Sequence, residues 1–267
     1  MKALLALALV VLVAFGIRVF RHESNLVPAI VTPQMNVYDE FSGDFTARLH
    51  RVIQRTIAAD HSPRLKLIAL TFDDGPYPIY TPLLLDQLHA LHVPATFFLI
   101  GRDAEQWPEI TRRIVLDGNE VADHTYSHPD LDHETPAQVR EEVLKGRDVL
   151  FALSGDPSVR DLMRPPHGRY TTTTLRTVTQ LGYDVVLWTD DSGDWRTLTP
   201  QHIEEELLRG ATAPDIVLLH NGKLATIQAL PTVVERFRRA GYTFVTVSQL
   251  LREVTTNAIN HPAREAV

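Results

Sequence analysis

Residues 67–76 read LIALTFDDGP, and this stretch decides the fold class. The apolar run 67–72 has the length of a buried strand, and Asp73-Asp74-Gly75-Pro76 ends it with turn-forming residues. Six further short apolar runs follow along the chain, separated by amphipathic segments. The predicted strands are 67–72, 95–100, 120–122, 162–164, 184–188, 216–219 and 243–245.

Helix signals lie between these predicted strands. Thr135-Pro136-Ala137-Gln138 is a capping box with proline at the first helical position. Thr199-Pro200 opens another helical segment. Strands and helices that alternate about seven times predict an α/β fold with a parallel sheet covered by helices. This spacing fits both a closed barrel and an open, doubly wound sheet.

Composition excludes several classes of protein. The 267 residues are 44% hydrophobic and 22% charged, which is typical of a folded chain rather than a disordered one. A net charge of −7 does not provide the basic face that a nucleic-acid partner requires. No glycine-rich phosphate loop follows a predicted strand, which argues against nucleotide binding. Because the chain has no cysteine, cysteine-ligated zinc is excluded.

The N-terminus has the pattern of an export segment. Residues 3–17 are apolar or glycine and follow Lys2, as in a signal peptide, and 14–16 could be a cleavage site. Arg18 directly after the run favours an uncleaved membrane anchor. We expect a signal peptide or anchor at 1–21, a connector at 22–62 with a short amphipathic helix capped by Asp44, a catalytic domain at 63–254 and a flexible tail at 255–267. The protein is then exported, facing the periplasm or the outside, or secreted if the segment is cleaved.

Polar residues gather where the predicted strands end, and in parallel α/β folds that edge carries function. Each such residue has an ordinary structural explanation when taken alone. Asp73-Asp74-Gly75-Pro76 could be a simple turn, and His220 could be a buried core histidine. Five strand ends that all carry ligand or acid–base groups are harder to explain separately. These ends are Asp73-Asp74, His124 to His128, Arg164 to His167, Asp191 to Trp195, and His220.

Metal-assisted hydrolysis needs such a combination of residues. Two neutral imidazoles and one carboxylate make a three-ligand site that leaves a coordination position open for water. A second carboxylate can take a proton from that water, and a nearby arginine keeps this carboxylate ionised. A histidine held charged by an aspartate can protonate a leaving amine.

With these motifs the sequence resembles the polysaccharide deacetylase family, the NodB-homology domain of carbohydrate esterase family four. The resemblance runs from about Leu67 to Val254 and includes five motifs in the expected order. It implies a distorted (β/α) barrel of about seven parallel strands. It also implies the metal ligands Asp74, His124 and His128, for zinc or alternatively cobalt, nickel or manganese.

The resemblance further implies roles for the other site residues. Asp73 is expected to be the catalytic base, which Arg164 orients and ionises. His220 is expected to be the general acid with Asp191 as its partner, and Asp194 is expected to be structural. The remaining assignments concern substrate binding: His167 through its backbone N–H, and Trp195 and Leu218 as walls of an acetyl pocket.

The implied activity is hydrolysis of the N-acetyl group of an amino sugar in a polysaccharide such as peptidoglycan or a chitin-type glycan. An O-acetyl esterase acting on a xylan-type glycan and an inactive carbohydrate-binding relative are the alternatives. The sequence departs from the family at His167, where an aromatic residue is frequent, and at Tyr77, where serine or threonine is common. The side-chain contacts to the sugar could therefore differ.

Overall fold

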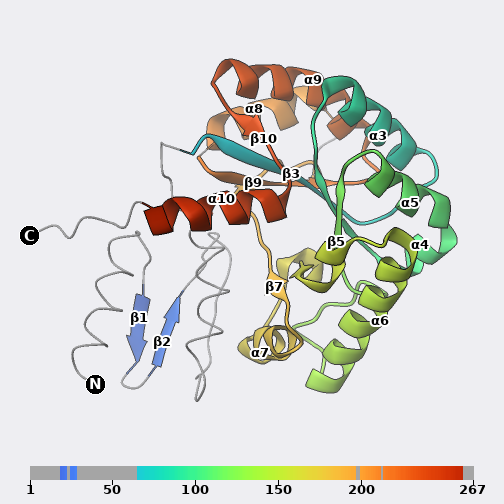
Figure 1. Ribbon diagram of the computed structural model, residues 1–267, viewed down its shortest axis with the longest axis vertical. Coiled ribbons are helices and arrows are strands. Elements are labelled where there is room, and N and C mark those ends of the chain that lie inside the picture. The colour runs from blue at the N-terminus through green and yellow to red at the C-terminus, as the bar shows by residue number, and fades with distance from the viewer. Residues whose placement is uncertain (1–18, 23–24, 29–64, 197–198, 212, 261–267) are drawn as a thin grey trace, which may run out of the picture.

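Figure 1 shows the computed structural model, which describes residues 19–22, 25–28, 65–196, 199–211 and 213–260. The apolar run 3–17 and the predicted connector helix after Asp44 lie outside these residues. Strands β1 (Val19–His22) and β2 (Asn25–Pro28) pair as an antiparallel hairpin. In the described part of the chain, none of the helices combines the length and the apolar character that a membrane crossing requires.

A single parallel sheet forms the centre of the fold, and the predicted α/β class is confirmed. Its strands run in the order β7-β6-β5-β4-β3-β9-β8, and β10 pairs with the first residues of β3. The bounds are β3 (Leu67–Asp73), β4 (Thr96–Leu99), β5 (Glu120–Asp123), β6 (Leu162–Met163), β7 (Asp184–Val185), β8 (Asp190–Asp191), β9 (Asp215–His220) and β10 (Thr243–Phe244).

The two edge strands of this sheet are consecutive in the chain, which bends the sheet into a distorted barrel. Only residues 186–189 connect β7 to β8, and a chain of that length spans at most roughly 19 Å. The prediction of one strand over 184–188 is therefore wrong in detail. The chain leaves the sheet after Val185 and re-enters it at Asp190 on the opposite edge. No pairing between β7 and β8 occurs among the described residues, so this connection forms a seam in the barrel wall.

Helices surround the sheet (Figure 1). The capping box that Thr135 and Gln138 were expected to form is present at the start of α6. Helix α10 continues to Asn260, beyond the boundary expected at residue 254, and the Thr255 hydroxyl donates to the Leu251 carbonyl. The helices are α3 (Tyr80–Leu91), α4 (Gly101–Gln106), α5 (Pro108–Leu116), α6 (Pro136–Ser154), η1 (Pro157–Arg160), η2 (Pro166–Gly168), α7 (Thr172–Gln180), α8 (Pro200–Gly210), α9 (Leu224–Arg239) and α10.

Side-chain alternation along β3 divides the core and sets the direction of the site. Ile68, Leu70 and Phe72 join the large apolar cluster that includes residues of α3 and α9. Ala69 faces the other way and packs with residues of α10. Because the side-chain period of a strand is two, Asp73 points to the same side as Ala69. The Asp73 carboxylate therefore points into the interior of the barrel, at the carboxyl end of β3.

Candidate active site

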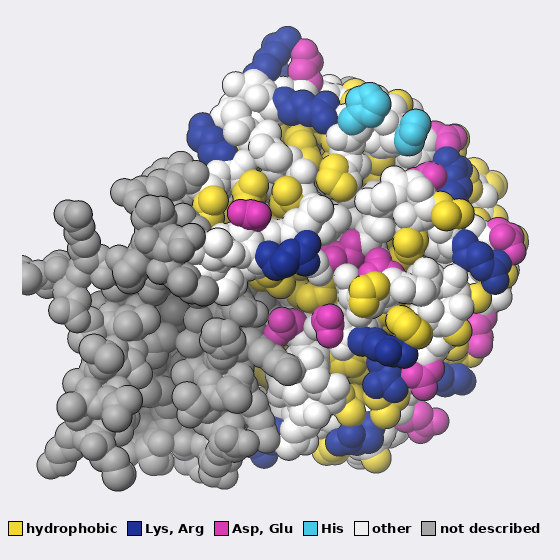
Figure 2. Space-filling view, viewed as in Figure 1, with side chains coloured by type: hydrophobic (Ala, Val, Ile, Leu, Met, Phe, Trp, Pro, Cys, Tyr) yellow, Lys and Arg dark blue, Asp and Glu magenta, His cyan; other side chains and the backbone are white. Residues whose placement is uncertain are grey.

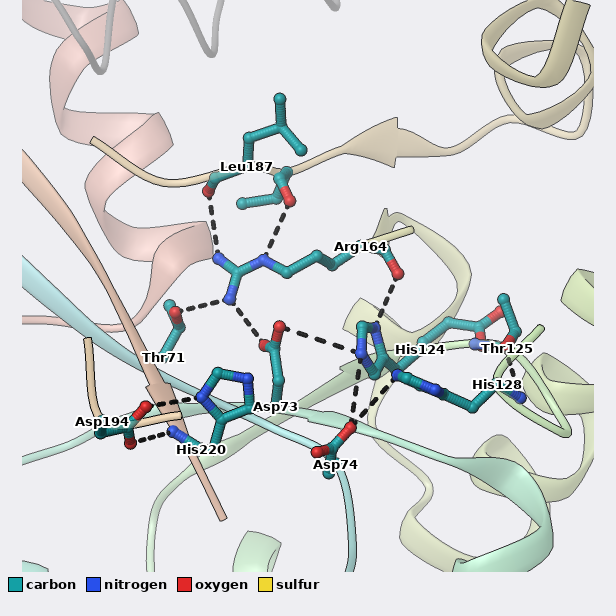
Figure 3. A network of polar contacts seen from close by, with 12 residues as sticks. Thr71, Asp73, Asp74, His124, Thr125, His128, Arg164, Leu187, Asp194 and His220 are labelled. Carbon is teal, nitrogen blue, oxygen red and sulfur yellow. Dashed lines mark hydrogen bonds and ion pairs between the residues drawn. The ribbon is translucent and has the colours of Figure 1, made fainter. Parts of the chain in front are cut away.

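The carboxyl ends of β3, β5, β6 and β9 bring the predicted site residues together (Figure 3). Asp73 and His220 are direct register partners on β3 and β9. Arg164 follows β6, and His124 follows β5. Parallel strands present their carboxyl ends at one edge, so residues up to 147 positions apart in the chain converge on one cluster.

Asp74, His124 and His128 face a common centre. Oδ1 of Asp74 lies 3.3 Å from Nε2 of His128 and 3.8 Å from Nε2 of His124. One potential ligand atom from each of the three residues lies within 4.8 Å of the others. This spacing and this donor set suit a divalent cation bound by two imidazole nitrogens and one carboxylate oxygen.

The second ring nitrogen of His124 determines which nitrogen is available to a metal ion. Nδ1 of His124 lies 2.8 Å from the carbonyl oxygen of Arg164, which can only accept a hydrogen bond. Nδ1 therefore carries the proton, and the lone pair of Nε2 points toward Asp74. Burial lowers the pKa of His124 to about 3, against the opposing charge of Asp74, so the ring is neutral. A neutral imidazole is the form that binds metals.

Asp73 is buried beside Arg164, which binds it directly. Nη1 of Arg164 donates to Oδ1 of Asp73 at 2.7 Å and to the Thr71 hydroxyl at 2.8 Å. Burial raises the pKa of Asp73, and the charge and hydrogen bond of Arg164 counter part of that rise. Burial therefore increases the proton affinity of the Asp73 carboxylate while Arg164 stays bound to it. A general base requires such an increased affinity for protons.

Arg164 also fills the seam of the barrel wall. Its Nε donates to the Val186 carbonyl at 3.1 Å, and its Nη2 donates to the Leu187 carbonyl at 3.0 Å. These carbonyls lie in the connection between β7 and β8. The fully buried guanidinium is therefore hydrogen-bonded at all three of its nitrogens.

The partner of His220 is Asp194, and the expectation of Asp191 is wrong. Nδ1 of His220 lies 2.7 Å from Oδ1 of Asp194, whose Oδ2 accepts from the His220 backbone N–H and the Thr226 hydroxyl, both at 2.7 Å. Burial lowers the pKa of His220, but the hydrogen bond and charge of Asp194 outweigh it and raise the value to about 8. His220 is therefore protonated at neutral pH.

Asp191 instead stabilises the turn that places Asp194 beside His220. Its Oδ1 accepts the Gly193 N–H at 2.9 Å, and its Oδ2 lies 3.5 Å from the indole nitrogen of Trp195. Gly193 has φ +65, a left-handed conformation that glycine adopts without strain. The chain turns back there, which places the buried Asp194 against His220. The sequence shows both aspartates, Asp191 and Asp194, but only the geometry of the turn shows which of them reaches His220.

The predicted substrate-binding residues lie around this cluster. Leu218 is buried on β9 two residues before His220 and therefore on the same face of the strand. Trp195 is 54% exposed. The exposed His167 ring packs edge-on against His128, with ring centroids 4.7 Å apart, and its Nδ1 lies 2.7 Å from Oδ1 of Asp130. Sequence reasoning did not find this contact with Asp130.

Unusual backbone conformations concentrate at the site. Among the described residues, five non-glycine residues have positive φ, and four of them are Asp74, Thr125, His128 and His167. Such conformations are costly and persist where the surrounding structure enforces them. Two of the four are candidate ligands, so the fold imposes the ligand geometry through the backbone as well as through side-chain contacts.

Comparisons with known proteins agree with this arrangement. A sequence profile described as polysaccharide deacetylase matches residues 60–186. A peptidoglycan-N-acetylglucosamine deacetylase of Bacillus cereus is 35% identical over 192 residues, covering 70% of this chain and 89% of the relative. A chitooligosaccharide deacetylase of Bradyrhizobium is 36% identical over 197 residues, covering 68% and 90%. The solved structure of the peptidoglycan deacetylase PdaC from Bacillus subtilis matches with a TM-score of 0.66 at 32% identity, covering 75% and 98%.

Proposed function

The chain belongs to the polysaccharide deacetylase family, and on that premise we propose that it hydrolyses the N-acetyl group of an amino sugar in a glycan of the peptidoglycan or chitin type. Acetate and a free sugar amine are the products. The observation that carries the proposal is the pairing of Asp73 with His220 on adjacent strands, beside the Asp74, His124 and His128 cluster. Burial raises the proton affinity of Asp73, and His220 is a protonated acid.

The residues of the chain divide the reaction between them. Asp73 accepts a proton from the attacking water as the new carbon–oxygen bond forms. The charged His220 gives its proton to the departing nitrogen as the carbon–nitrogen bond breaks. The backbone N–H of His167 donates to the oxygen that becomes negative, and Leu218 and Trp195 wall the site of the acetyl methyl group. A divalent ion bound by Asp74, His124 and His128, for which we propose zinc, would polarise the acetyl carbonyl and lower the pKa of a coordinated water.

The protonated His220 favours an amide over an ester substrate. A departing amine nitrogen is a strong base and needs a proton as its bond breaks, whereas an alkoxide leaves more readily. Asp194 keeps His220 charged, because its Oδ1 faces the imidazole and its Oδ2 is held by the His220 backbone N–H and the Thr226 hydroxyl. Because His220 is protonated at neutral pH, it supports deacetylation of amino sugars rather than of O-acetyl xylan.

We also propose that the protein acts outside the cytoplasm. The basic start and the apolar run at 3–17 support export. Arg18 at the end of that run supports retention as a membrane anchor. The names of the relatives from Bacillus cereus and Bacillus subtilis place their substrate in the cell wall, and an anchor would hold this enzyme close to such a polymer.

Acetate release tests the proposal. The full chain, loaded with zinc, is incubated with chitooligosaccharides, peptidoglycan and acetylated xylan, with and without a chelator. We expect acetate from an N-acetylated glycan, and loss of that release in the chelator. A metal-replete protein that leaves all three substrates unchanged contradicts the proposal, and release from xylan alone establishes the esterase instead.

The variant Asp73→Asn tests the role of the base. Loss of a positioned general base typically costs 10²–10⁴ in rate, so kcat should fall by about a thousandfold. Bound metal, measured by elemental analysis, should stay unchanged because Asp73 is not among the three clustered ligands. Asp86→Asn, on the surface of α3, is the matched control. Near-normal turnover by the Asp73 variant refutes this assignment.

A further inference from the structure

The loop from His124 to His128, which carries two candidate ligands, has every backbone N–H hydrogen-bonded. His124 donates to the Leu99 carbonyl at 3.0 Å, and Thr125 donates to Oδ1 of Asp123 at 2.8 Å. His128 donates to the Thr125 hydroxyl at 3.1 Å. The two remaining N–H groups, of Tyr126 and Ser127, both go to one residue outside the loop.

That residue is Glu142, on the face of α6 that packs against the loop. Its backbone carbonyl accepts the Tyr126 N–H at 3.1 Å. Its Oε2 accepts the Ser127 N–H at 2.8 Å, and its Oε1 accepts the Ser127 hydroxyl at 2.8 Å. The carboxylate therefore binds both donors of the residue that directly precedes His128.

The backbone of His128 explains why this contact matters. Its φ is +65, and the Thr125 φ is +69, so the loop adopts a conformation that non-glycine residues avoid. A loop held in such a conformation needs contacts from outside. Helix α6 supplies them at close range, because a Cβ atom at Gly146, one turn after Glu142, would lie 2.9 Å from the Thr125 carbonyl carbon.

We infer that Glu142 is a positioning residue for the metal site: by binding both donors of Ser127, it fixes the direction of His128. This inference rests on the metal site of the proposed function. Glu142 touches neither the substrate nor the ligand cluster, and acts through Ser127. Contacts that orient metal ligands typically change metal affinity 10–100-fold when they are lost.

Neighbouring glutamates on α6 provide a matched pair of variants. Glu142→Ala removes both acceptor oxygens, so the N–H and the hydroxyl of Ser127 both lose their partner; a glutamine could keep both contacts, because its NH2 group can donate to the hydroxyl oxygen. Glu141→Ala makes the same change at the adjacent exposed position. The readout is zinc affinity, measured by titration of the metal-free full chain against a chelating dye, together with the melting temperature of each metal-free variant.

We expect Glu142→Ala to weaken zinc binding by about tenfold or more, and Glu141→Ala to bind zinc like the unchanged chain. Ser127→Ala should lose less, and should add little when combined with Glu142→Ala, because the hydroxyl contact is already lost in that variant. At saturating zinc, kcat should return to within a few-fold of normal.

Two results overturn the inference. One is unchanged zinc affinity in Glu142→Ala, whether or not its melting temperature falls, since that would mean a purely structural role. The other is the absence of saturable zinc binding by the unchanged chain. A titration that behaves as expected in a protein that releases no acetate contradicts only the proposed function, so the two failures are distinguishable.

Discussion

Asp194 and Asp191 show how single residues of the same type take different roles. Asp191 is the last residue of β8, and Asp194 follows it by three residues. The buried Asp194 binds the imidazole of His220, whereas Asp191 binds the turn between them. Burial alone would make His220 a neutral base, and the carboxylate reverses this outcome. The acid function belongs to the pair rather than to the histidine.

The pH profile of Asp194→Asn tests this pair. His220 acts as an acid only when protonated, so kcat/KM falls as pH rises through its pKa of about 8. An asparagine removes the negative charge, burial then dominates, and the alkaline limb should move down by at least about one pH unit. Asp191→Asn should leave that limb near pH 8. An unmoved limb in the Asp194 variant would show that another group sets it.

At the scale of elements, α6 and the His124–His128 loop are packed without space for a methyl group. Gly146 faces Oδ1 of Asp123 and the Thr125 carbonyl, and a Cβ there would approach them to 2.7 and 2.9 Å. A glycine in the middle of a helix is unfavourable by itself. Its presence indicates that close approach of the helix to the ligand loop outweighs helix propensity here.

Gly146→Ala separates these two effects. Helix propensity alone predicts a gain of about 1 kcal/mol in the free energy of unfolding. Overpacking predicts a loss of about 1–3 kcal/mol and displacement of Thr125. We expect destabilisation in urea unfolding, together with weaker zinc binding in the dye titration. A more stable variant with normal zinc affinity would show that the loop can move away at little cost.

At the scale of the whole molecule, the edge strand β8 carries a buried acid that links global stability to pH. Asp190 is buried against Gly210 at the end of α8, and its Oδ2 has no hydrogen-bond partner among the described residues. Burial, followed by the charges of Asp215, Asp191 and Glu206, raises the pKa of Asp190 to about 7. The folded state therefore holds a proton that the unfolded chain releases near pH 4.

The proton that Asp190 holds in the folded state determines how the free energy of unfolding changes with pH. Since the folded pKa lies above the unfolded one, the contribution of Asp190 to stability is greatest below pH 4, falls as pH rises to 7 and is constant above that. Asp190→Asn should therefore gain on the order of 2 kcal/mol over the unchanged chain between pH 5 and pH 8. Denaturant unfolding of the metal-free proteins measures it, with Asp86→Asn as control. Parallel pH curves for Asp190→Asn and the unchanged chain contradict the prediction.

The parts of this structure that could be predicted from the sequence depend on local chemistry. The capping box at Thr135 and Gln138 is a contact over three residues, and it formed as expected. The positions of Asp73 and His220 follow from where apolar runs end. The break between β7 and β8, the choice of Asp194, and the contact of Glu142 with Ser127 depend on turns and packing across the fold. No periodicity in the chain encodes such distances.

Arg164 has a consequence for how this protein can evolve. One guanidinium ionises Asp73 and also satisfies two carbonyls where the wall of strands is interrupted. In a descendant without activity, a neutral hydrogen-bond acceptor in place of the carboxylate would leave the guanidinium without its counter-charge but keep its hydrogen bonds. Loss of the arginine would instead leave the buried carboxylate and two main-chain oxygens without their donor. We therefore expect inactive descendants of this protein to retain Arg164 after Asp73 has been replaced.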